Sequence, residues 1–246
     1  MYARCLGKSH PDVDCDADSA GDCDGPASRR FMNIADVVIP WARIIHLGDA
    51  AVTIPAAAAI TVWLVTGRAW RAAFWWCLLF AVGIGLVVAS KIAFLGWGSG
   101  MRSLDFKAIS GHAMLTTAII PLIFYILLQR YAPLARALAV MLGMVSGAAM
   151  GVLLVVLNEH SVSEAIAGYV IGGFVSLGFI RMAGRLPSLS LNRWLIPLIL
   201  LAFFAAWYIR LESLEDWMTS VALYLSGHDR PYSWATWELG LPACSV

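Results

Sequence analysis

Long apolar runs are the feature that most limits what this chain can fold into. They cover approximately 49–67, 72–95, 110–130, 134–157, 160–181 and 193–210. A helix of about 20 apolar residues crosses the hydrocarbon core of a bilayer, so each run is long enough to span a membrane. Backbone polar groups inside lipid must bond within their own segment, which favours helices. The sequence predicts an all-α fold, a polytopic membrane helical bundle of about six transmembrane helices.

The composition excludes several classes of protein. The chain is 60% hydrophobic and 13% charged, which is too apolar for an ordinary soluble domain. Its net charge is +1 and no basic cluster alternates with aromatic residues, so we expect no nucleic-acid partner. The five cysteines form no CxxC pair and no Cys/His spacing suited to zinc. We therefore expect no structural metal.

The segments outside the apolar runs suggest how the chain is divided. Residues 1–30 are rich in Asp, Gly and Ser, which predicts a disordered acidic tail. Residues 31–47 mix apolar and charged residues, which favours an interfacial helix. Residues 48–211 hold the six spans and form one transmembrane domain. In 212–246, apolar residues recur at helical spacing beside acidic ones, which predicts an amphipathic surface helix followed by a tail.

The distribution of basic residues predicts the orientation of the bundle. Arg residues collect in alternate connections, at 68, 71, 130, 136, 181, 185 and 193. Positive charge favours the cytoplasmic face, so residues 96–109 and the junction at 158–160 are expected on the opposite face. We expect an integral protein of the bacterial inner (cell) membrane, with that face toward the periplasm or exterior.

Ionisable side chains near the ends of the spans mark a candidate functional site. Such residues are costly beside lipid and usually serve a function. The predicted topology brings eight of them to the non-cytoplasmic face: Lys91, Arg102, Asp105, Lys107, His112, Glu159, His160 and Glu164.

His160 and Glu164 form the chemically most informative pair. They lie four residues apart, on one face of a predicted helix. Glu164 can accept a hydrogen bond from one imidazole nitrogen and leave the other free and basic, able to attack phosphorus. His112, from another helix, can then protonate the leaving oxygen as general acid. The alternatives are a structural His160–Glu164 pair and a capping or packing role for His112.

The remaining polar residues suit the binding of phosphate. A helix beginning at Ser110 offers free N–H groups, and Gly111 allows close approach to the backbone. Lys91, Arg102 and Lys107 supply cations for the charge that builds up in phosphoryl transfer. The alternatives are that Ser110 is a simple N-cap, that Lys91 reaches to the membrane interface, and that the other two cations are solvated.

Three segments resemble the motifs of the type 2 phosphatidic acid phosphatase superfamily of integral membrane lipid phosphatases. The motifs are a Lys followed by Arg-Pro, a Pro-Ser-Gly-His, and a Ser-Arg followed by His and, four residues on, Asp. The corresponding segments are "KIAFLGWGSGMR", "ISGHAM" and "LLVVLNEHSVSEAIAG". The resemblance covers roughly residues 47–180.

The resemblance implies roles for individual residues. It makes His160 the nucleophile, Glu164 the substitute for the orienting Asp, and His112 the general acid. Phosphate binding is implied for Lys91, Ser110 and Gly111.

The chain also departs from the family pattern. Gly98 stands where the Arg of the first motif is expected, and Leu153-Leu154 replace the Ser-Arg of the third. A bidentate cation for phosphate is therefore missing, because leucine has no donor. The cations available to compensate are Arg102 and Lys107.

The sequence thus predicts a membrane phosphatase, a phosphoric monoester or diphosphate hydrolase acting on a lipid phosphate or prenyl pyrophosphate through a phosphohistidine. The mechanism requires no metal and no cofactor, because cations and amides meet the charge. One alternative is a non-catalytic relative that binds or transports lipid headgroups in the same pocket. Another is a lipid phosphotransferase, which shares the first half-reaction.

Overall fold

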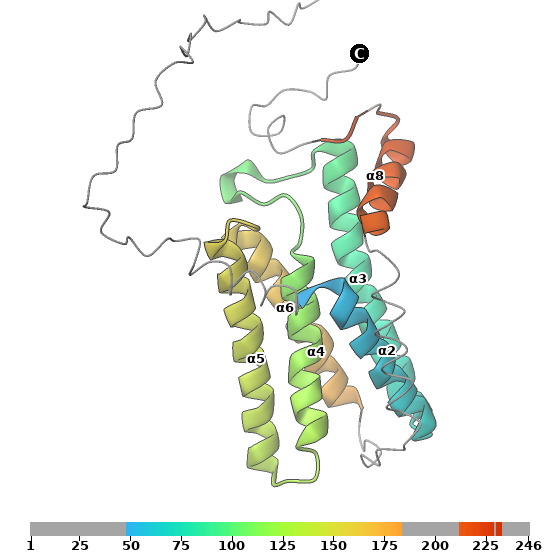
Figure 1. The fold of residues 1–246 in the computed structure, drawn as a ribbon, viewed down its shortest axis with the longest axis vertical. Coiled ribbons are helices and arrows are strands. Elements are labelled where there is room, and N and C mark those ends of the chain that lie inside the picture. The colour runs from blue at the N-terminus through green and yellow to red at the C-terminus, as the bar shows by residue number, and fades with distance from the viewer. Residues whose placement is uncertain (1–47, 184–211, 229, 233–246) are drawn as a thin grey trace, which may run out of the picture.

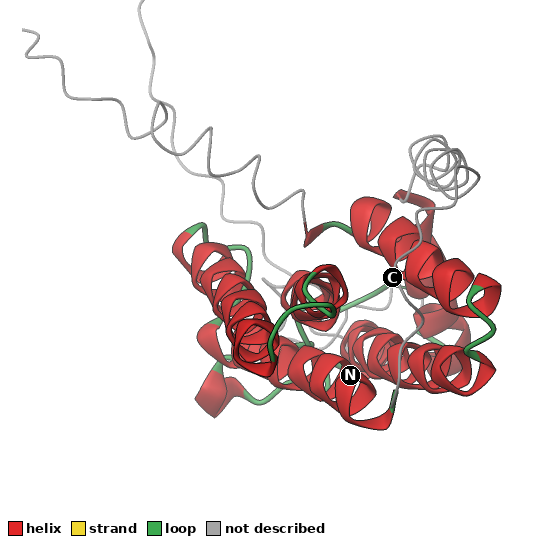
Figure 2. Ribbon diagram, turned by 90° about the horizontal axis from the view of Figure 1, so that it is seen from below, coloured by secondary structure: helices red, strands yellow, loops and turns green. Residues whose placement is uncertain are grey.

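The computed structural model describes residues 48–183, 212–228 and 230–232. Within these ranges the chain forms helices and loops, with no named strand (Figure 2). The elements are α2 (Ala50–Thr66), α3 (Trp70–Trp97), the short 3-10 turn η2 (Arg102–Leu104), α4 (Gly111–Leu127), α5 (Pro133–Val156), α6 (Val162–Met182) and α8 (Glu212–Ser226). The predicted all-α class is confirmed.

The helices α2 to α6 occupy the first five apolar runs. Three of them, α3, α5 and α6, have 28, 24 and 21 residues and are long and apolar enough to cross a membrane. The apolar helices α2 and α4 have 17 residues each, a length of about 26 Å that is near the lower limit for a span. This arrangement is that of a membrane helical bundle. The predicted tail 1–30, interfacial helix 31–47 and sixth span 193–210 lie outside the described residues.

Helix α4 packs closely against α5 and α6 because small residues face it. A Cβ atom added at Gly143 or Gly147 of α5 would collide with Pro121 or Thr117 of α4. On α6, a Cβ at Gly168 would collide with the carbonyl oxygen of Ser110, just before α4 begins. Small residues allow such close backbone contact between helices in membranes. The beginning of α4 is thereby held against α6.

Trp76 joins α2, α3 and α6 in the main apolar core. Its side chain is 1% exposed, and its Nε1 donates a hydrogen bond of 3.2 Å to the carbonyl oxygen of Ala57. The ring stacks on Phe80 at 5.1 Å and meets Phe179 edge-on at 5.5 Å. Burial of the large ring together with its polar N–H fixes the packing of three helices.

Helix α8 is attached to the carboxyl end of α3. The last carbonyl groups of a helix have no hydrogen-bond donors within that helix. At the end of α3, residues that follow α8 supply these donors. His228 Nδ1 donates to the Gly96 carbonyl oxygen at 2.9 Å, and the Tyr232 N–H donates to that of Leu95 at 2.9 Å. A Cβ at Gly96 would lie 3.1 Å from the Ala222 carbonyl oxygen, so the two helices are in close contact.

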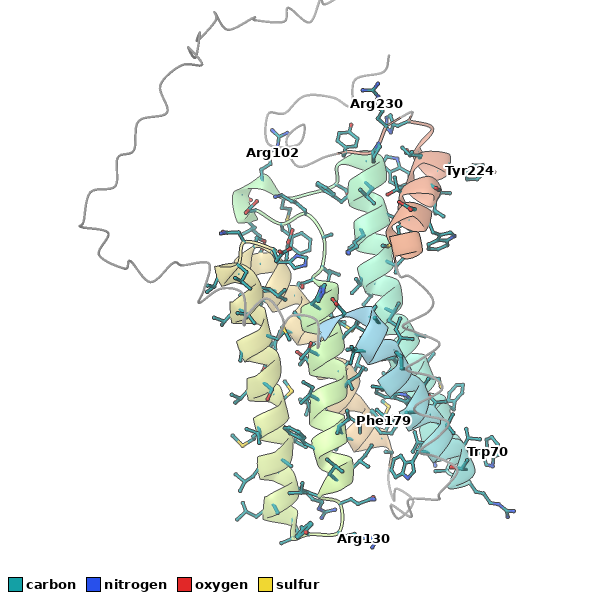
Figure 3. The ribbon with its side chains drawn as sticks, viewed as in Figure 1. Trp70, Arg102, Arg130, Phe179, Tyr224 and Arg230 are labelled. Carbon is teal, nitrogen blue, oxygen red and sulfur yellow. The ribbon has the colours of Figure 1, made fainter. Side chains whose placement is uncertain are left out.

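The helix directions bring several element ends together at one end of the bundle. The end of α3, the start of α4, the end of α5 and the start of α6 all lie in the upper part of Figure 1. Arg102 marks that end and Arg130 marks the opposite one (Figure 3). The candidate residues on these elements therefore share one end of the molecule.

Candidate active site

The loop between α3 and α4 forms one side of the site. It begins at Gly98, which ends α3 in the left-handed conformation at φ 61°, a conformation that favours glycine. Before α4 the loop is tied to both neighbouring helices. The Ile109 N–H donates to Ser90 Oγ at 3.0 Å, and the Ser110 N–H donates to the Glu164 carbonyl oxygen at 3.3 Å. The loop backbone is thus held over the start of α6.

His160 and Glu164 are hydrogen bonded, with 2.8 Å between His160 Nδ1 and Glu164 Oε2. An ionised carboxylate only accepts hydrogen bonds, so in this bond Nδ1 carries the proton. The other carboxylate oxygen, Oε1, accepts from the N–H groups of Lys107 at 2.9 Å and Ala108 at 3.3 Å. The Glu164 side chain is only 4% exposed. Four fixed donors, counting the Ser161 N–H at 3.3 Å, therefore meet this buried carboxylate.

Glu164 also belongs to the cap of α6. Ser161 is the N-cap, and its hydroxyl accepts from the Glu164 N–H at 3.4 Å while the Glu164 carboxylate accepts from the Ser161 N–H. This is a capping box, which the sequence prediction missed although its Ser-x-x-Glu pattern is present there. Glu164 can therefore have both a structural and a chemical role, because the cap fixes the same carboxylate that orients His160.

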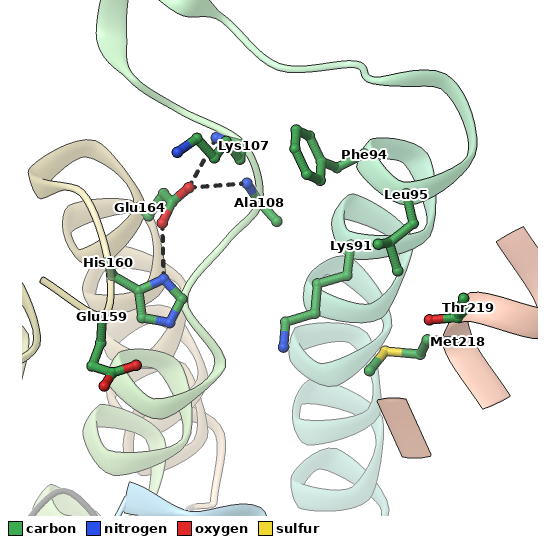
Figure 4. A pocket seen from close by; sticks show the side chains of 10 residues that line it. All are labelled: Lys91, Phe94, Leu95, Lys107, Ala108, Glu159, His160, Glu164, Met218 and Thr219. Atoms are coloured by element: carbon green, nitrogen blue, oxygen red, sulfur yellow. Dashed lines mark hydrogen bonds and ion pairs between the residues drawn. The ribbon is translucent and has the colours of Figure 1, made fainter. Parts of the chain in front are cut away.

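A cavity of about 250 Å³ opens beside His160 (Figure 4). Its lining comes from α3, the following loop, the junction between α5 and α6, the start of α6, and α8: Lys91, Phe94, Leu95, Lys107, Ala108, Glu159, His160, Glu164, Met218 and Thr219. In Figure 4 the second ring nitrogen of His160 and the ammonium of Lys91 face each other across it. Phe94, Leu95 and Met218 form the apolar side. The sequence did not predict that α8 contributes to this wall.

His112 lies near His160 and is paired with a residue that sequence reasoning missed. The ring centroids of the two histidines are 6.5 Å apart. His112 Nε2 and Asp49 Oδ1 are 2.6 Å apart, and both side chains are 34% exposed. Asp49 stands at the very edge of the first apolar run, and an acid at that place was the available signal.

Ser110 and Gly111 are placed at the start of α4. Ser110 is fully buried as the N-cap, and its Oγ accepts from the Ala113 N–H at 3.4 Å. Gly111 is partly exposed, and neither residue lines the cavity. The contacts of Ser110 are those of an N-cap. Phosphate binding by Ser110 and Gly111 stays a prediction.

The three predicted cations have different positions. Lys91 and Lys107 line the cavity, and Lys107, whose side chain is 4% exposed, has Nζ 3.5 Å from Asp105 Oδ1. Arg102 is exposed on η2, at the outer end of the molecule in Figure 3, and does not line the cavity. The structure therefore brings the two lysines to the site but not Arg102.

Leu154 occupies the position where the motif comparison expects arginine. It is 1% exposed and packs with Ala113 and Met150. Its carbonyl oxygen accepts from the N–H groups of Glu159 at 3.0 Å and His160 at 3.3 Å. In this chain the Leu154 side chain is part of an apolar core, and its carbonyl oxygen holds the backbone of His160.

A metal site among the described residues would need a cluster of His, Cys, Asp or Glu side chains. No group of three or more His, Cys, Asp or Glu side chains there is arranged to hold a metal ion. The expectation that the chemistry needs neither metal nor cofactor stays a prediction.

Similarity to known proteins supports the family resemblance seen in the three motifs. The family model described as the PAP2 superfamily matches residues 95–188, which include both histidines and Glu164. An uncharacterised 22.5 kDa protein in the cps region of Klebsiella pneumoniae is 38% identical over 149 residues, or 60% of this chain and 71% of that protein. No solved structure matches the chain. The predicted family is confirmed, and the chain belongs to the PAP2 superfamily, that is, the type 2 phosphatidic acid phosphatase superfamily.

Proposed function

We propose that this membrane protein hydrolyses a lipid phosphate or prenyl pyrophosphate through a phosphohistidine on His160, at the non-cytoplasmic face of a bacterial inner membrane. Family membership indicates a phosphatase-type function on a phosphorylated substrate. The lipid nature of the substrate, the covalent intermediate and the orientation in the membrane are our proposals beyond family membership.

The observation that carries the proposal is the geometry around His160. Its Nδ1 is bound to Glu164 at 2.8 Å, which leaves Nε2 facing the cavity as a basic nitrogen. Glu164 is held by Lys107, Ala108 and Ser161, so the imidazole is oriented before any substrate enters. A preoriented nucleophile beside a cation is what attack on a phosphate ester requires.

The first half-reaction transfers the phosphoryl group to the enzyme. The lone pair of His160 Nε2 forms an N–P bond while the P–O bond to the leaving group breaks. The departing oxygen keeps the bonding electron pair and takes a proton from His112. For a lipid monophosphate the product is the lipid alcohol, and for a prenyl pyrophosphate it is the prenyl monophosphate. Lys91 meets negative charge on the phosphoryl oxygens.

The second half-reaction returns the enzyme to its starting state. Water attacks phosphorus as His112 takes one of its protons, and the N–P bond breaks with its electron pair returning to His160. Inorganic phosphate leaves, so the sum of both steps is hydrolysis of one phosphate bond by one water. A phosphotransferase would use the same first step and replace water by an alcohol acceptor.

The two sides of the cavity support a lipid substrate. Lys91 and His160 suit an anionic headgroup, with Lys107 close by but paired with Asp105, and Glu159 also lines the cavity. Phe94 and Met218 offer apolar contact. The cavity lies at the ends of long apolar helices, where a headgroup can enter with its chains still in lipid. We propose that the two lysines compensate in part for the arginine that Leu154 replaces.

The test is release of inorganic phosphate by the purified full-length protein, with chelator present. The panel contains phosphatidate, a prenyl pyrophosphate and p-nitrophenyl phosphate. We expect release from at least one lipid substrate, and loss of it in His160→Ala because the nucleophile is gone. A matched variant, Asp216→Asn, changes an exposed residue of α8 and should keep full activity. Equal release by His160→Ala and the unchanged protein would refute the mechanism.

One observation favours the non-catalytic alternative, which is the apolar Leu154 in place of arginine. The two functions differ in covalent chemistry. A phosphohistidine that is trapped by acid-free quenching, and is absent in His160→Ala, supports the phosphatase. Binding of phosphatidate that persists in His160→Ala, with no turnover by the unchanged protein, supports a headgroup binder.

A further inference from the structure

We propose that Asp49 is a positioning residue for His112, holding its Nε2–H so that Nδ1 transfers the proton to the leaving group. This inference rests on the proposed function, because it assigns a partner to the general acid. Asp49 lies outside residues 95–188, the part that matches the family model. It also precedes all three motif segments.

The contact itself is short and joins separate helices. Asp49 Oδ1 lies 2.6 Å from His112 Nε2, and the two residues are 63 positions apart in the sequence. Gly48 allows the chain to approach α4 there, since a Cβ at that position would lie 2.8 Å from Thr116 Oγ1 and 3.5 Å from the Cβ of His112. The backbone before α2 is therefore placed so that the carboxylate reaches the imidazole.

The ordinary role of an aspartate at this position is not the one seen. Asp49 is the N-cap of α2, where an aspartate side chain commonly accepts a hydrogen bond from the helix backbone. Its side chain makes no such bond, and only its carbonyl oxygen accepts from Val52 and Thr53. The carboxylate is instead directed at His112, which indicates a purpose other than capping.

The two histidine–carboxylate pairs are complementary. Glu164 binds Nδ1 of His160 and leaves Nε2 available, whereas Asp49 binds Nε2 of His112 and leaves Nδ1 available. The ring centroids are 6.5 Å apart. The nucleophile and the proton donor must lie on opposite sides of the reacting phosphorus. Two imidazole rings that are held separately, each with one nitrogen left available, suit these two roles.

The carboxylate has a defined part in the proton transfer. Before the reaction, Asp49 balances the positive charge of the protonated His112 ring and fixes its plane. As the P–O bond breaks, the proton on Nδ1 moves to the departing oxygen, and the Nε2–H remains bonded to Asp49. In the second half-reaction, Nδ1 takes a proton from water and the same pair is restored. Asp49 itself gains and loses no proton.

The experiment measures how Asp49→Asn changes the hydrolysis of two substrates, phosphatidate with a poor leaving group and p-nitrophenyl phosphate with a good one. The alcohol of phosphatidate needs a proton as it departs, but p-nitrophenolate does not. We expect kcat/KM for phosphatidate to fall by roughly 10- to 100-fold, a part of the range for general acid catalysis, and kcat/KM for p-nitrophenyl phosphate to change by less than about 3-fold. The ratio kcat/KM reports only the steps up to phosphoryl transfer, so slow hydrolysis of the intermediate does not affect it.

Two further variants separate positioning from folding. In His112→Gln, adding Asp49→Asn should cause no further loss with phosphatidate, because Asp49 acts through the missing ring. Asp49→Glu should recover part of the activity with phosphatidate, since it restores the carboxylate. Equal losses with both substrates, or additive losses in the double variant, would overturn the proposal.

A spectroscopic measurement tests the pairing if the unchanged protein hydrolyses neither of these two substrates. Inactivity on the whole phosphate panel, prenyl pyrophosphate included, would refute the proposed function. In ¹⁵N-histidine spectra, with His112→Gln used for assignment, Asp49→Asn should shift the His112 resonances and leave those of His160 in place. Unchanged His112 resonances would overturn the pairing whether or not the protein is a phosphatase.

Discussion

Glu164 illustrates how one residue combines structure and chemistry. Its backbone N–H and carboxylate complete the cap of α6, and the same carboxylate accepts from His160 Nδ1. Every carboxylate contact that the structure assigns comes from a donor, at Lys107, Ala108, Ser161 and His160. A group that can only accept is therefore needed at this position.

We expect Glu164→Gln to lower kcat by roughly 10²- to 10⁴-fold, as in other sites where the orienting acid becomes an amide. The amide oxygen can still accept from the loop, but the NH₂ group then faces two donors, His160 Nδ1–H and the Ser161 N–H. His160 moves its proton to Nε2 to relieve the conflict, and the nucleophile is lost. The measurement is kcat with the best substrate of the phosphate panel.

Ser161→Ala is the matched control, because it removes only the hydroxyl of the cap. It should cost about 1 kcal/mol in the free energy of unfolding and leave kcat largely intact. If Ser161→Ala lost as much activity as Glu164→Gln at similar stability, the carboxylate would matter only for folding.

At the scale of elements, α8 contributes to the cavity although it follows the matched family region by more than 20 residues. Its residues Met218 and Thr219 line the cavity, although residues 95–188 alone match the family model. Close contact at Gly96, together with hydrogen bonds from His228 and Tyr232, holds this helix on the end of α3. The shape of the cavity therefore depends on an interface between two helices.

We expect Gly96→Leu to displace α8 and to raise KM for the lipid substrate. The new side chain meets the Ala222 carbonyl oxygen and Ser226 Cβ, which lie 3.1 and 3.3 Å from an added Cβ. Such overpacking typically costs about 1–3 kcal/mol in the free energy of unfolding. Thermal unfolding and steady-state kinetics with the best lipid of the phosphate panel measure both effects.

Gly85→Leu supplies the control on the same helix, because nothing lies within 4 Å of an added Cβ there. It should leave KM unchanged and should not destabilise α3, since leucine favours helix more than glycine does. An unchanged KM in Gly96→Leu, despite lower stability, would show that α8 does not shape the binding site.

At the scale of the whole molecule, the two ends of the bundle differ in chemistry. The cavity is lined by residues of the loop between α3 and α4, and His112 lies beside His160, which is part of the cavity wall. Arg102 of that loop marks one end of the molecule and Arg130 the other (Figure 3). The alternating arginine clusters predict that the end with Arg130 faces the cytoplasm. The site would then act on lipids of the outer leaflet of the inner membrane.

Accessibility of single cysteines tests this orientation in a variant without native cysteines. A membrane-impermeant maleimide should label Ser103→Cys in intact spheroplasts, because Ser103 is exposed on η2 beside the site. Tyr131→Cys, exposed between α4 and α5, should react only after the membrane is made permeable. Denatured protein should label at both positions, and the reverse pattern in intact spheroplasts would contradict the predicted orientation.

Much of the fold could be predicted because its signals are local. A hydrophobic run of sufficient length determines a spanning helix by itself, so α2 to α6 coincide with the first five runs. The pairing of His160 with Glu164 was also predicted, but not for the right reason. His160 precedes the N-cap Ser161 and lies outside α6, so the turn before the helix, and not a shared helix face, brings its ring to Glu164. The motif order sufficed to predict the family without knowledge of any contact.

The rest of the site depended on contacts between distant parts of the chain. The sequence by itself determined the class of fold, the helices, the family and the His160–Glu164 pair. Only the tertiary structure decided that Asp49 meets His112 across 63 positions, that the Lys107 amide meets Glu164 across 57, and that α8 rather than Arg102 lines the cavity. The physical reason is that helical periodicity specifies which residues share a face, whereas close packing at small residues selects which faces meet.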